Sequence, residues 1–221
     1  MSGDVKPRRR YESPHRREQA AATRRQILEA AQRLFERDGY ASTSIAAVAR
    51  EAGVASKTVY LAFESKRGLL LALWHLLLRG DEEPVPVGER DWFRAVVEER
   101  DPERRLRLNA RNSRVVKERA GGLLAVIRDA ASVDAEIDAL WQRIEREFRA
   151  NQRSVVELLH EQGALRAGLD VERAADVLWA LNHPSLWWLL VGERGWSGDE
   201  YEAWLADLHS AQILAPSDPT G

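Results

Sequence analysis

The stretch Ala52–Lys66, AGVASKTVYLAFESK, places several hydrogen-bonding side chains on one short segment. Ser56, Thr58 and Tyr60 carry hydroxyl groups, and Lys57 adds a positive charge. Short donors of this kind can reach base edges or phosphate oxygens in the major groove of DNA, which is about 12 Å wide and admits an α-helix. Such chemistry requires an element that presents these side chains on one outward face.

The segments before this stretch are predicted to be helical. Apolar residues at helical spacing predict a first helix that begins at Thr23 and stops at Gly39. Ser44 is a suitable N-cap for a second helix of about two turns. Gly53 follows that helix and can adopt the left-handed conformation that ends it.

A third helix is predicted to begin with Ser56 as its N-cap and to run to about Phe63, with Val59 and Phe63 on its buried side. Its other side carries two hydroxyl groups, a cation and two aliphatic side chains, with a phenol toward the edge: Ser56, Lys57, Thr58, Leu61 and Ala62, with Tyr60. Two short helices joined through Gly53 form a helix-turn-helix candidate. Duplex DNA is the surface that these outward side chains suit.

Lys66 lies in the first turn of a fourth predicted helix, which Ser65 caps. The helix dipole favours anions at this position, so a lysine is unusual there. A bound phosphate would resolve the conflict, because it accepts hydrogen bonds from the backbone amides and from the ammonium group. A solvated lysine is the alternative. Ser44, at the start of the second helix, is a candidate for another phosphate contact.

Charge is distributed unevenly along this chain of net charge −2. Basic residues outnumber acidic ones in residues 1–70, and acidic residues outnumber basic ones in the remainder. Such asymmetry is expected when one end of a protein binds a polyanion. Residues 1–22, with Arg8–Arg10 and Arg16–Arg17, are predicted to form a flexible basic arm that adds salt-sensitive affinity. A solubilising tail is favoured over an arm that follows the minor groove.

The segment IAAVAREAGVASKTVYLAFESKRGLL closely resembles the DNA-binding domain of the tetracycline-repressor-like (TetR) transcriptional regulators, and TRRQILEAAQRLFERDGYASTS resembles their first helix. The resemblance covers about Thr23 to Leu73. It implies phosphate contacts by Tyr60 and Lys66, assisted by Thr58 and Ser44, and groove contacts by Ser56, Lys57 and Leu61. Many members carry histidine or another larger side chain at the position of Ala62, so we expect one contact to be missing here.

The rest of the chain is also predicted to be helical, which makes the protein all-α. We expect a three-helix DNA-binding domain over residues 23–66, a helical domain over residues 67–214 and a loose tail over residues 215–221. Further helices are predicted over residues 92–100, 102–120, 123–131, 133–162 and 199–214, together with one over residues 171–191 that is bent at Asn182-His183-Pro184.

The resemblance implies that the C-terminal domain binds a small-molecule effector and forms a homodimer. Candidate ligand-binding residues lie on inward-looking stretches and offer polar or aromatic groups: Trp74, Arg104, Leu108, Arg111, Trp141, Trp179 and His183. For Arg104 and Arg111 a solvated helix face is the favoured alternative. Trp187, Trp188 and Trp204 are candidates for a dimer interface built as a four-helix bundle, although packing within the chain explains any one of them equally well.

Catalysis has no support in the sequence. His160-Glu161 begins like the H-E-x-x-H zinc motif, but Ala164 occupies the position of the second histidine. No cysteine is present, and we expect no metal or cofactor. The longest apolar run, Gly68–Leu78, is too short to span a membrane, and the N-terminus lacks the apolar part of a secretion signal.

These observations predict a cytoplasmic, homodimeric transcriptional regulator. We expect a repressor that a small-molecule effector releases from a palindromic operator in double-stranded DNA. The alternative is a DNA-binding architectural or partner-controlled protein without a small-molecule ligand.

Overall fold

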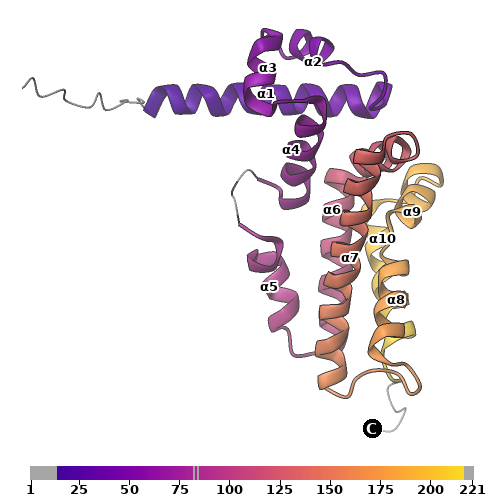
Figure 1. Ribbon diagram of the computed structural model, residues 1–221. Helices are drawn as coiled ribbons and strands as arrows, with labels where there is room; N and C mark the ends of the chain where they lie inside the picture. The colour runs from indigo at the N-terminus through magenta and orange to yellow at the C-terminus, as the bar shows by residue number, and fades with distance from the viewer. Residues whose placement is uncertain (1–13, 82, 84, 217–221) are drawn as a thin grey trace, which may run out of the picture. The chain divides into compact units, whose positions relative to one another are not determined.

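The computed structural model describes residues 14–81, 83 and 85–216 (Figure 1). These residues form helices joined by turns, and no strand occurs among them, which confirms the predicted all-α fold. They fall into two compact units. The N-terminal unit contains the described residues up to Asp38 together with Ser42–Leu73, and the C-terminal unit contains Gly39–Ala41 and the described residues from Trp74 onward. No helix in the described part of the chain is long and apolar enough to cross a membrane.

The N-terminal unit is built from α1 (Pro14–Asp38), α2 (Ile45–Glu51), α3 (Ser56–Phe63) and the first part of α4 (Lys66–Arg79). Apolar residues at helical spacing place one side of each helix in a common core, where α2 packs against both α1 and α3. The core contains Ile27, Leu28, Ala30, Ala31, Leu34, Phe35, Ile45, Val48, Ala49, Val59, Phe63, Leu69, Leu70 and Leu73.

Helix α1 begins at Pro14, whereas the sequence predicted a start at Thr23. Proline is tolerated in a first helical turn, because its missing amide hydrogen would have no partner there. Residues 16–21 are exposed, so this extension buries no apolar surface and gave no periodic signal. The predicted start is therefore wrong, and residues 14–22 are helical rather than part of a flexible arm. Arg8–Arg10 lie outside the described residues.

The turn between α2 and α3 follows the predicted chemistry. Ser44 Oγ accepts a hydrogen bond from the amide of Ala47 at 3.1 Å, which confirms Ser44 as the N-cap of α2. Gly53 has a φ of +68°, the left-handed conformation that its position after α2 requires. These two residues fix where α2 begins and where the chain turns toward α3.

The start of α3 differs from the prediction. Ala55 is the N-cap, without a side-chain hydrogen bond, and Ser56 is the first residue of the helix. The Ser56 hydroxyl is therefore not needed as a cap. The cap of α4 agrees with the prediction, because Ser65 Oγ accepts a hydrogen bond from the amide of Gly68 at 3.0 Å.

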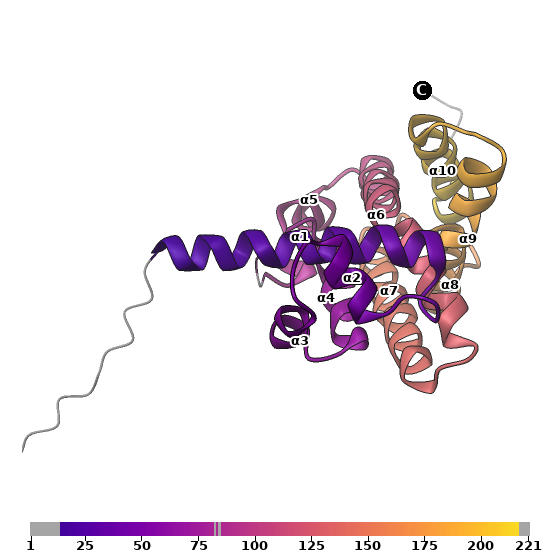
Figure 2. The same cartoon turned by 90° about the horizontal axis from the view of Figure 1, so that it is seen from above.

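The C-terminal unit contains a bundle of long helices with shorter elements around it. In Figure 1, α6, α7, α8 and α10 run side by side; α6 contacts α7 and α10, and α8 contacts the same two helices. Figure 2 shows the bundle from above. After α4, the elements of the C-terminal unit are η1 (Val87–Glu89), α5 (Asp91–Glu98), α6 (Pro102–Ala131), α7 (Ala135–Glu161), α8 (Val171–Leu181), α9 (Pro184–Trp187), the π-helical η2 (Trp188–Glu193) and α10 (Gly198–Ile213).

Helix α6 runs without interruption through Gly121-Gly122, where the sequence predicted two separate helices. The glycines mark a close approach instead of a break. Trp188 Nε1 donates a hydrogen bond to the carbonyl of Gly121 at 3.0 Å, and a Cβ on Gly121 would lie 3.3 Å from Trp187 Nε1. Two glycines lower helix propensity, but tertiary packing of the neighbouring tryptophans overrides that local preference.

The predicted bend at Asn182-His183-Pro184 is a full break. Helix α8 ends at Leu181, and α9 starts at Pro184 with His183 as its N-cap. His183 Nδ1 accepts a hydrogen bond from the amide of Ser185 at 3.2 Å. At the C-terminal end, the amide of Ala215 donates to the carbonyl of Ala164 at 3.0 Å, so the first residue of the predicted loose tail is bonded.

Candidate nucleic-acid interface and ligand-binding region

Helix α3 is anchored from one side. Val59 is fully buried and Phe63 is 5% exposed, as the helical spacing predicted. The Arg24 guanidinium of α1 lies 4.3 Å from the centroid of the Phe63 ring and donates to the carbonyl of Ala62 at 3.1 Å. A cation–π contact and a hydrogen bond therefore fix the C-terminal end of α3 to α1.

The opposite side of α3 is exposed. Leu61 is 77% exposed and Tyr60 is 53% exposed, although both are large side chains with apolar surface. Lys57 is exposed as well, whereas Ser56 and Thr58 are half-buried. The fold thus brings the five predicted α3 contacts onto a single short helix whose outer side carries a cation, a phenol and an aliphatic group.

The two predicted phosphate contacts outside α3 both lie at helix starts. Ser44 is exposed at the start of α2, and Lys66 is half-buried as the first residue of α4. Gly68 controls the approach of α4 to α3, because a Cβ on Gly68 would collide with the backbone carbonyl of Phe63. The sequence analysis did not single out Gly68. Its signal is a glycine in the first turn of a helix, where glycine has poor propensity.

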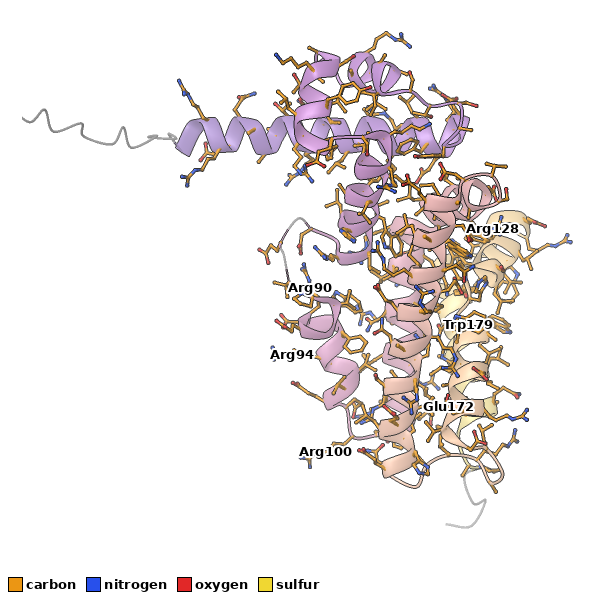
Figure 3. The ribbon with its side chains drawn as sticks, viewed as in Figure 1. Arg90, Arg94, Arg100, Arg128, Glu172 and Trp179 are labelled. Atoms are coloured by element: carbon orange, nitrogen blue, oxygen red, sulfur yellow. The ribbon has the colours of Figure 1, made fainter. Side chains whose placement is uncertain are left out.

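Three of the seven predicted ligand-binding residues come together. The His183 ring centroid lies 6.5 Å from that of Trp141 and 5.6 Å from that of Trp179, which is labelled in Figure 3. The Glu145 carboxylate lies 3.6 Å from His183 Nε2. The other four predicted residues are scattered: Trp74 is buried, Leu108 is half-buried, and Arg104 and Arg111 are exposed.

The predicted interface tryptophans make contacts within the chain. The Trp187 ring meets that of Tyr201 edge-on at 5.0 Å. Trp188 bonds the carbonyl of Gly121, as described above, and the Arg128 guanidinium lies 4.2 Å from its ring (Figure 3). Trp204 is half-buried between Trp196 and Tyr201, with both ring centroids at 5.9 Å.

Buried polar groups of the C-terminal unit were missed by the sequence analysis. Gln152 Oε1 accepts hydrogen bonds from Asn109 Nδ2 at 2.9 Å and from Asn182 Nδ2 at 3.0 Å, which joins α6, α7 and the end of α8. Lys117 and His209 are also buried, at 4% and 0% exposure. Each lies on the apolar side of a helix, and this helical register is the signal that would have found them.

This geometry defines a helix-turn-helix transcriptional regulator, with α3 in the position of the recognition helix. Residues 27–73 match the family model described as bacterial regulatory proteins, tetR family. The matched residues are a TetR-family DNA-binding domain, which confirms the resemblance found in the sequence.

Curated relatives agree with this assignment. The chain is 28% identical over 170 residues to the probable HTH-type transcriptional regulator ArpR of Pseudomonas putida, an alignment that covers 74% of this chain and 78% of that protein. It is 38% identical over 60 residues to the HTH-type transcriptional regulator AcrR of Shigella flexneri, covering 27% of this chain and 28% of that protein.

Solved structures share the fold over most of the chain. A transcriptional regulator from Saccharomonospora viridis in complex with choline has a TM-score of 0.69 at 22% identity, covering 89% of this chain and 100% of that chain. NalD, the secondary repressor of the MexAB-OprM multidrug efflux pump in Pseudomonas aeruginosa, has a TM-score of 0.67 at 22% identity, covering 89% and 98%. At these identities the likeness establishes the fold.

Proposed function

We propose that the protein is a cytoplasmic repressor that binds a palindromic operator as a homodimer and leaves it when a small molecule binds the C-terminal unit. The outward face of α3 carries this proposal, because Leu61 and Tyr60 are exposed while Val59 and Phe63 anchor the helix from behind. Exposed apolar and phenolic groups next to Lys57 suit a DNA groove better than water.

The proposed DNA contacts divide into two kinds. Groove contacts come from Ser56, Lys57 and Leu61 on α3. Phosphate contacts come from Tyr60 and Lys66, assisted by Thr58 and by Ser44 at the start of α2. Phosphate contacts position a protein on DNA and make its affinity salt-dependent, whereas groove contacts read the sequence.

Two copies of the chain are required because two-fold symmetry of the protein matches a palindromic site. We place the dimer interface on α8 and α10, which would form a four-helix bundle with the same helices of a second copy. Trp204, half-buried on α10, is the tryptophan best placed for this role. Trp187 and Trp188 lie on α9 and η2 and not on these two helices, so we assign them a supporting role behind the interface.

The C-terminal unit is proposed to bind the effector. The regulator from Saccharomonospora viridis was solved with choline bound, which supports a small-molecule site in this fold. Among the predicted ligand contacts, Trp141, Trp179 and His183 are favoured because the fold brings them together, whereas the exposed Arg104 and Arg111 suit a solvated face. Release of DNA then requires that the effector bind the DNA-incompetent state of the dimer more tightly than the DNA-bound state.

The proposal is tested by measuring the affinity of the full-length protein for DNA selected from a random-sequence library, as a function of salt. Tyr60→Phe and Lys66→Ala should each weaken binding, and Lys66→Ala should lower the slope of log affinity against log salt by about one. Arg94→Ala, which removes an exposed cation on α5, is the matched control (Figure 3). Full affinity and an unchanged slope in both variants would refute the phosphate assignments.

The competing function is a DNA-binding architectural or partner-controlled protein. It predicts that no small molecule alters DNA affinity and that the selected DNA lacks two-fold symmetry. A palindromic consensus together with effector-dependent release would exclude it.

A further inference from the structure

Two buried arginines of the C-terminal unit each make several hydrogen bonds. The Arg90 guanidinium (Figure 3) bonds both carboxylate oxygens of Asp81, at 2.5 and 2.9 Å, and donates to two backbone carbonyls. Arg105 donates to Gln162 Oε1 at 2.7 Å and to the backbone carbonyls of Val96 in α5 and of Glu99 directly after it. Buried charge is tolerated when it is paired and hydrogen-bonded. Arg90 meets both conditions, whereas the hydrogen-bond partners of Arg105 are neutral and its positive charge is favoured through space by Glu99 and Glu161.

Lys117 of α6 is buried without a carboxylate partner. Its Nζ donates to Ser113 Oγ at 2.6 Å and to the Tyr201 hydroxyl at 3.1 Å, and it lies 5.1 Å from the centroid of the Tyr201 ring. Both oxygen partners are neutral, and no carboxylate of the described residues lies within 4.0 Å of the ammonium group. Burial without a counter-charge lowers the pKa of Lys117 to about 7.

A second basic side chain is buried near Lys117. His209 lies about two turns after Tyr201 on α10, and neither of its ring nitrogens has a hydrogen-bond partner among the described residues. Burial and then the charge of Lys117 lower the pKa of His209 to about 3, against a smaller opposing effect of the Leu106 carbonyl. Most buried polar atoms in proteins are bonded. In this neutral imidazole neither ring nitrogen has a partner in good hydrogen-bond geometry, although the Leu106 carbonyl lies close enough to act on the pKa.

Tyr201, the partner of Lys117, belongs to an apolar cluster. The cluster is formed by α6, α10 and the short α9 and η2 segments, and it contains Ala110, Leu205 and Ala206, with Leu181, Leu186, Trp187, Leu190, Val191 and Trp204 packed against it. A ligand that placed a charged group against Lys117 would therefore have these hydrocarbon and aromatic side chains beside it.

We propose that Lys117 binds the acid group of the effector, and that the effector is an organic monocarboxylate with an apolar body. The carboxylate supplies the missing counter-charge to the ammonium group, the Tyr201 hydroxyl helps to orient it, and His209 offers a ring N–H to an oxygen. This inference rests on the proposed function, because it identifies the chemical class of the small molecule that controls DNA binding.

A single negative charge fits this site better than a phosphate. The protonated form of Lys117 carries one positive charge, and His209 is neutral at physiological pH because its pKa is so low. A phosphate dianion would bring a second, uncompensated charge into an apolar interior, which is strongly unfavourable. A neutral ligand, in contrast, would leave the lysine without a counter-charge.

Nuclear magnetic resonance of the full-length protein tests the site directly. The sequence contains four lysines, so ¹³C labelling of lysine Cε gives four signals, and Lys117→Met identifies the one from Lys117. Octanoate and benzoate are the probes, with octanamide and benzamide as neutral counterparts. Either acid should raise the apparent pKa of Lys117 by about one pH unit or more, and the amides should not. A Lys117 titration that neither acid changes, or that acids and amides change equally, overturns the proposal.

Calorimetry and DNA binding separate this inference from the proposed function. Lys117→Met should bind DNA like the unmodified protein but bind the acids at least about tenfold more weakly, whereas Arg94→Met should bind them normally. An effector that releases both proteins from DNA equally contradicts the Lys117 site and leaves the repressor function intact. Acids that shift the Lys117 signal without altering DNA affinity contradict the repressor function and leave the site intact.

Discussion

The two units treat polar side chains in opposite ways. Among the described residues, the N-terminal unit buries one polar side chain, Thr43, and its hydroxyl donates to the carbonyl of Leu34. The C-terminal unit buries Arg90, Arg105, Asn109, Lys117, Gln152, Asn182 and His209. The buried side-chain atoms without partners also lie there, in Trp92, Arg119, Trp179, Asn182, His209 and Ser210.

This difference indicates that the interiors of the two units serve different purposes. An unpaired buried polar group destabilises a protein by about 1–3 kcal/mol, so an interior that serves only stability excludes such groups. The N-terminal unit follows that rule, and the side chains that we propose as DNA contacts lie outside its core. The C-terminal unit departs from it inside the bundle, and such departures are expected where a protein binds something.

The largest change in stability that tests this contrast is expected from two nearby positions on α3. Phe63→Ala should destabilise the N-terminal unit by about 3–5 kcal/mol, because it removes a buried ring and the Arg24 contact above it. Leu61→Ala should leave stability unchanged within about 0.5 kcal/mol, because Leu61 is 77% exposed. Hydrogen exchange of the N-terminal amides measures both, and a destabilised Leu61→Ala protein would show that this face is structural.

A smaller effect is expected where α3 approaches α4. Gly68→Ala should destabilise the N-terminal unit by about 3 kcal/mol, because the added methyl group meets the rigid backbone carbonyl of Phe63. Gly88→Ala is the matched control, since nothing lies within 4 Å of a Cβ there. Chemical denaturation compares the two variants, and equal stabilities would contradict the close approach of the two helices.

Much of the N-terminal unit was predictable because its signals are local. The N-cap Ser44, the left-handed Gly53 and the inward Val59 each follow from neighbours a few residues away. Helix α6 was misjudged for the opposite reason. Gly121-Gly122 looks like a break, and only the approach of Trp188 from a distant part of the chain shows why glycine is needed there.

The buried cation of α6 had a weak signal that was overlooked. Lys117 shares a helix face with Ala110, Ala120 and Leu124, so its register points it inward, and it is the only lysine after Lys66 in an arginine-rich chain. Charged residues on a helix are normally interpreted as solvated, and Lys117 was not distinguished from the neighbouring arginines for that reason. The hydrogen bond from Lys117 to Tyr201 could not be predicted from the sequence, because α6 and α10 meet only in the folded chain.

Lys117→Met tests the polar interior through the pH dependence of stability. The folded pKa of about 7 lies below the value of about 10.4 expected for an unfolded lysine, so between these values the unfolded chain binds more protons. Stability should therefore rise with pH, by about 2 kcal/mol from pH 7 to pH 9 for this group. In Lys117→Met that increase should disappear.

Denaturation by urea at pH 7, 8 and 9 measures this change. His209 does not interfere, because its folded pKa of about 3 and the unfolded value of about 6.5 both lie below this range. An equal increase in both proteins would mean that Lys117 remains charged in the folded state.

The smallest effect separates the structural and DNA-binding roles of Ser44. Ser44→Ala should destabilise the N-terminal unit by about 1 kcal/mol, because the amide of Ala47 loses its capping partner. Ser44→Asp keeps a good cap and should retain stability, but its carboxylate would face the phosphate that we place there. DNA affinity should then fall by about tenfold, or about 1.4 kcal/mol, in a protein that is fully folded. Unchanged affinity in Ser44→Asp would remove Ser44 from the interface and leave it, like the core behind it, as a residue that serves stability alone.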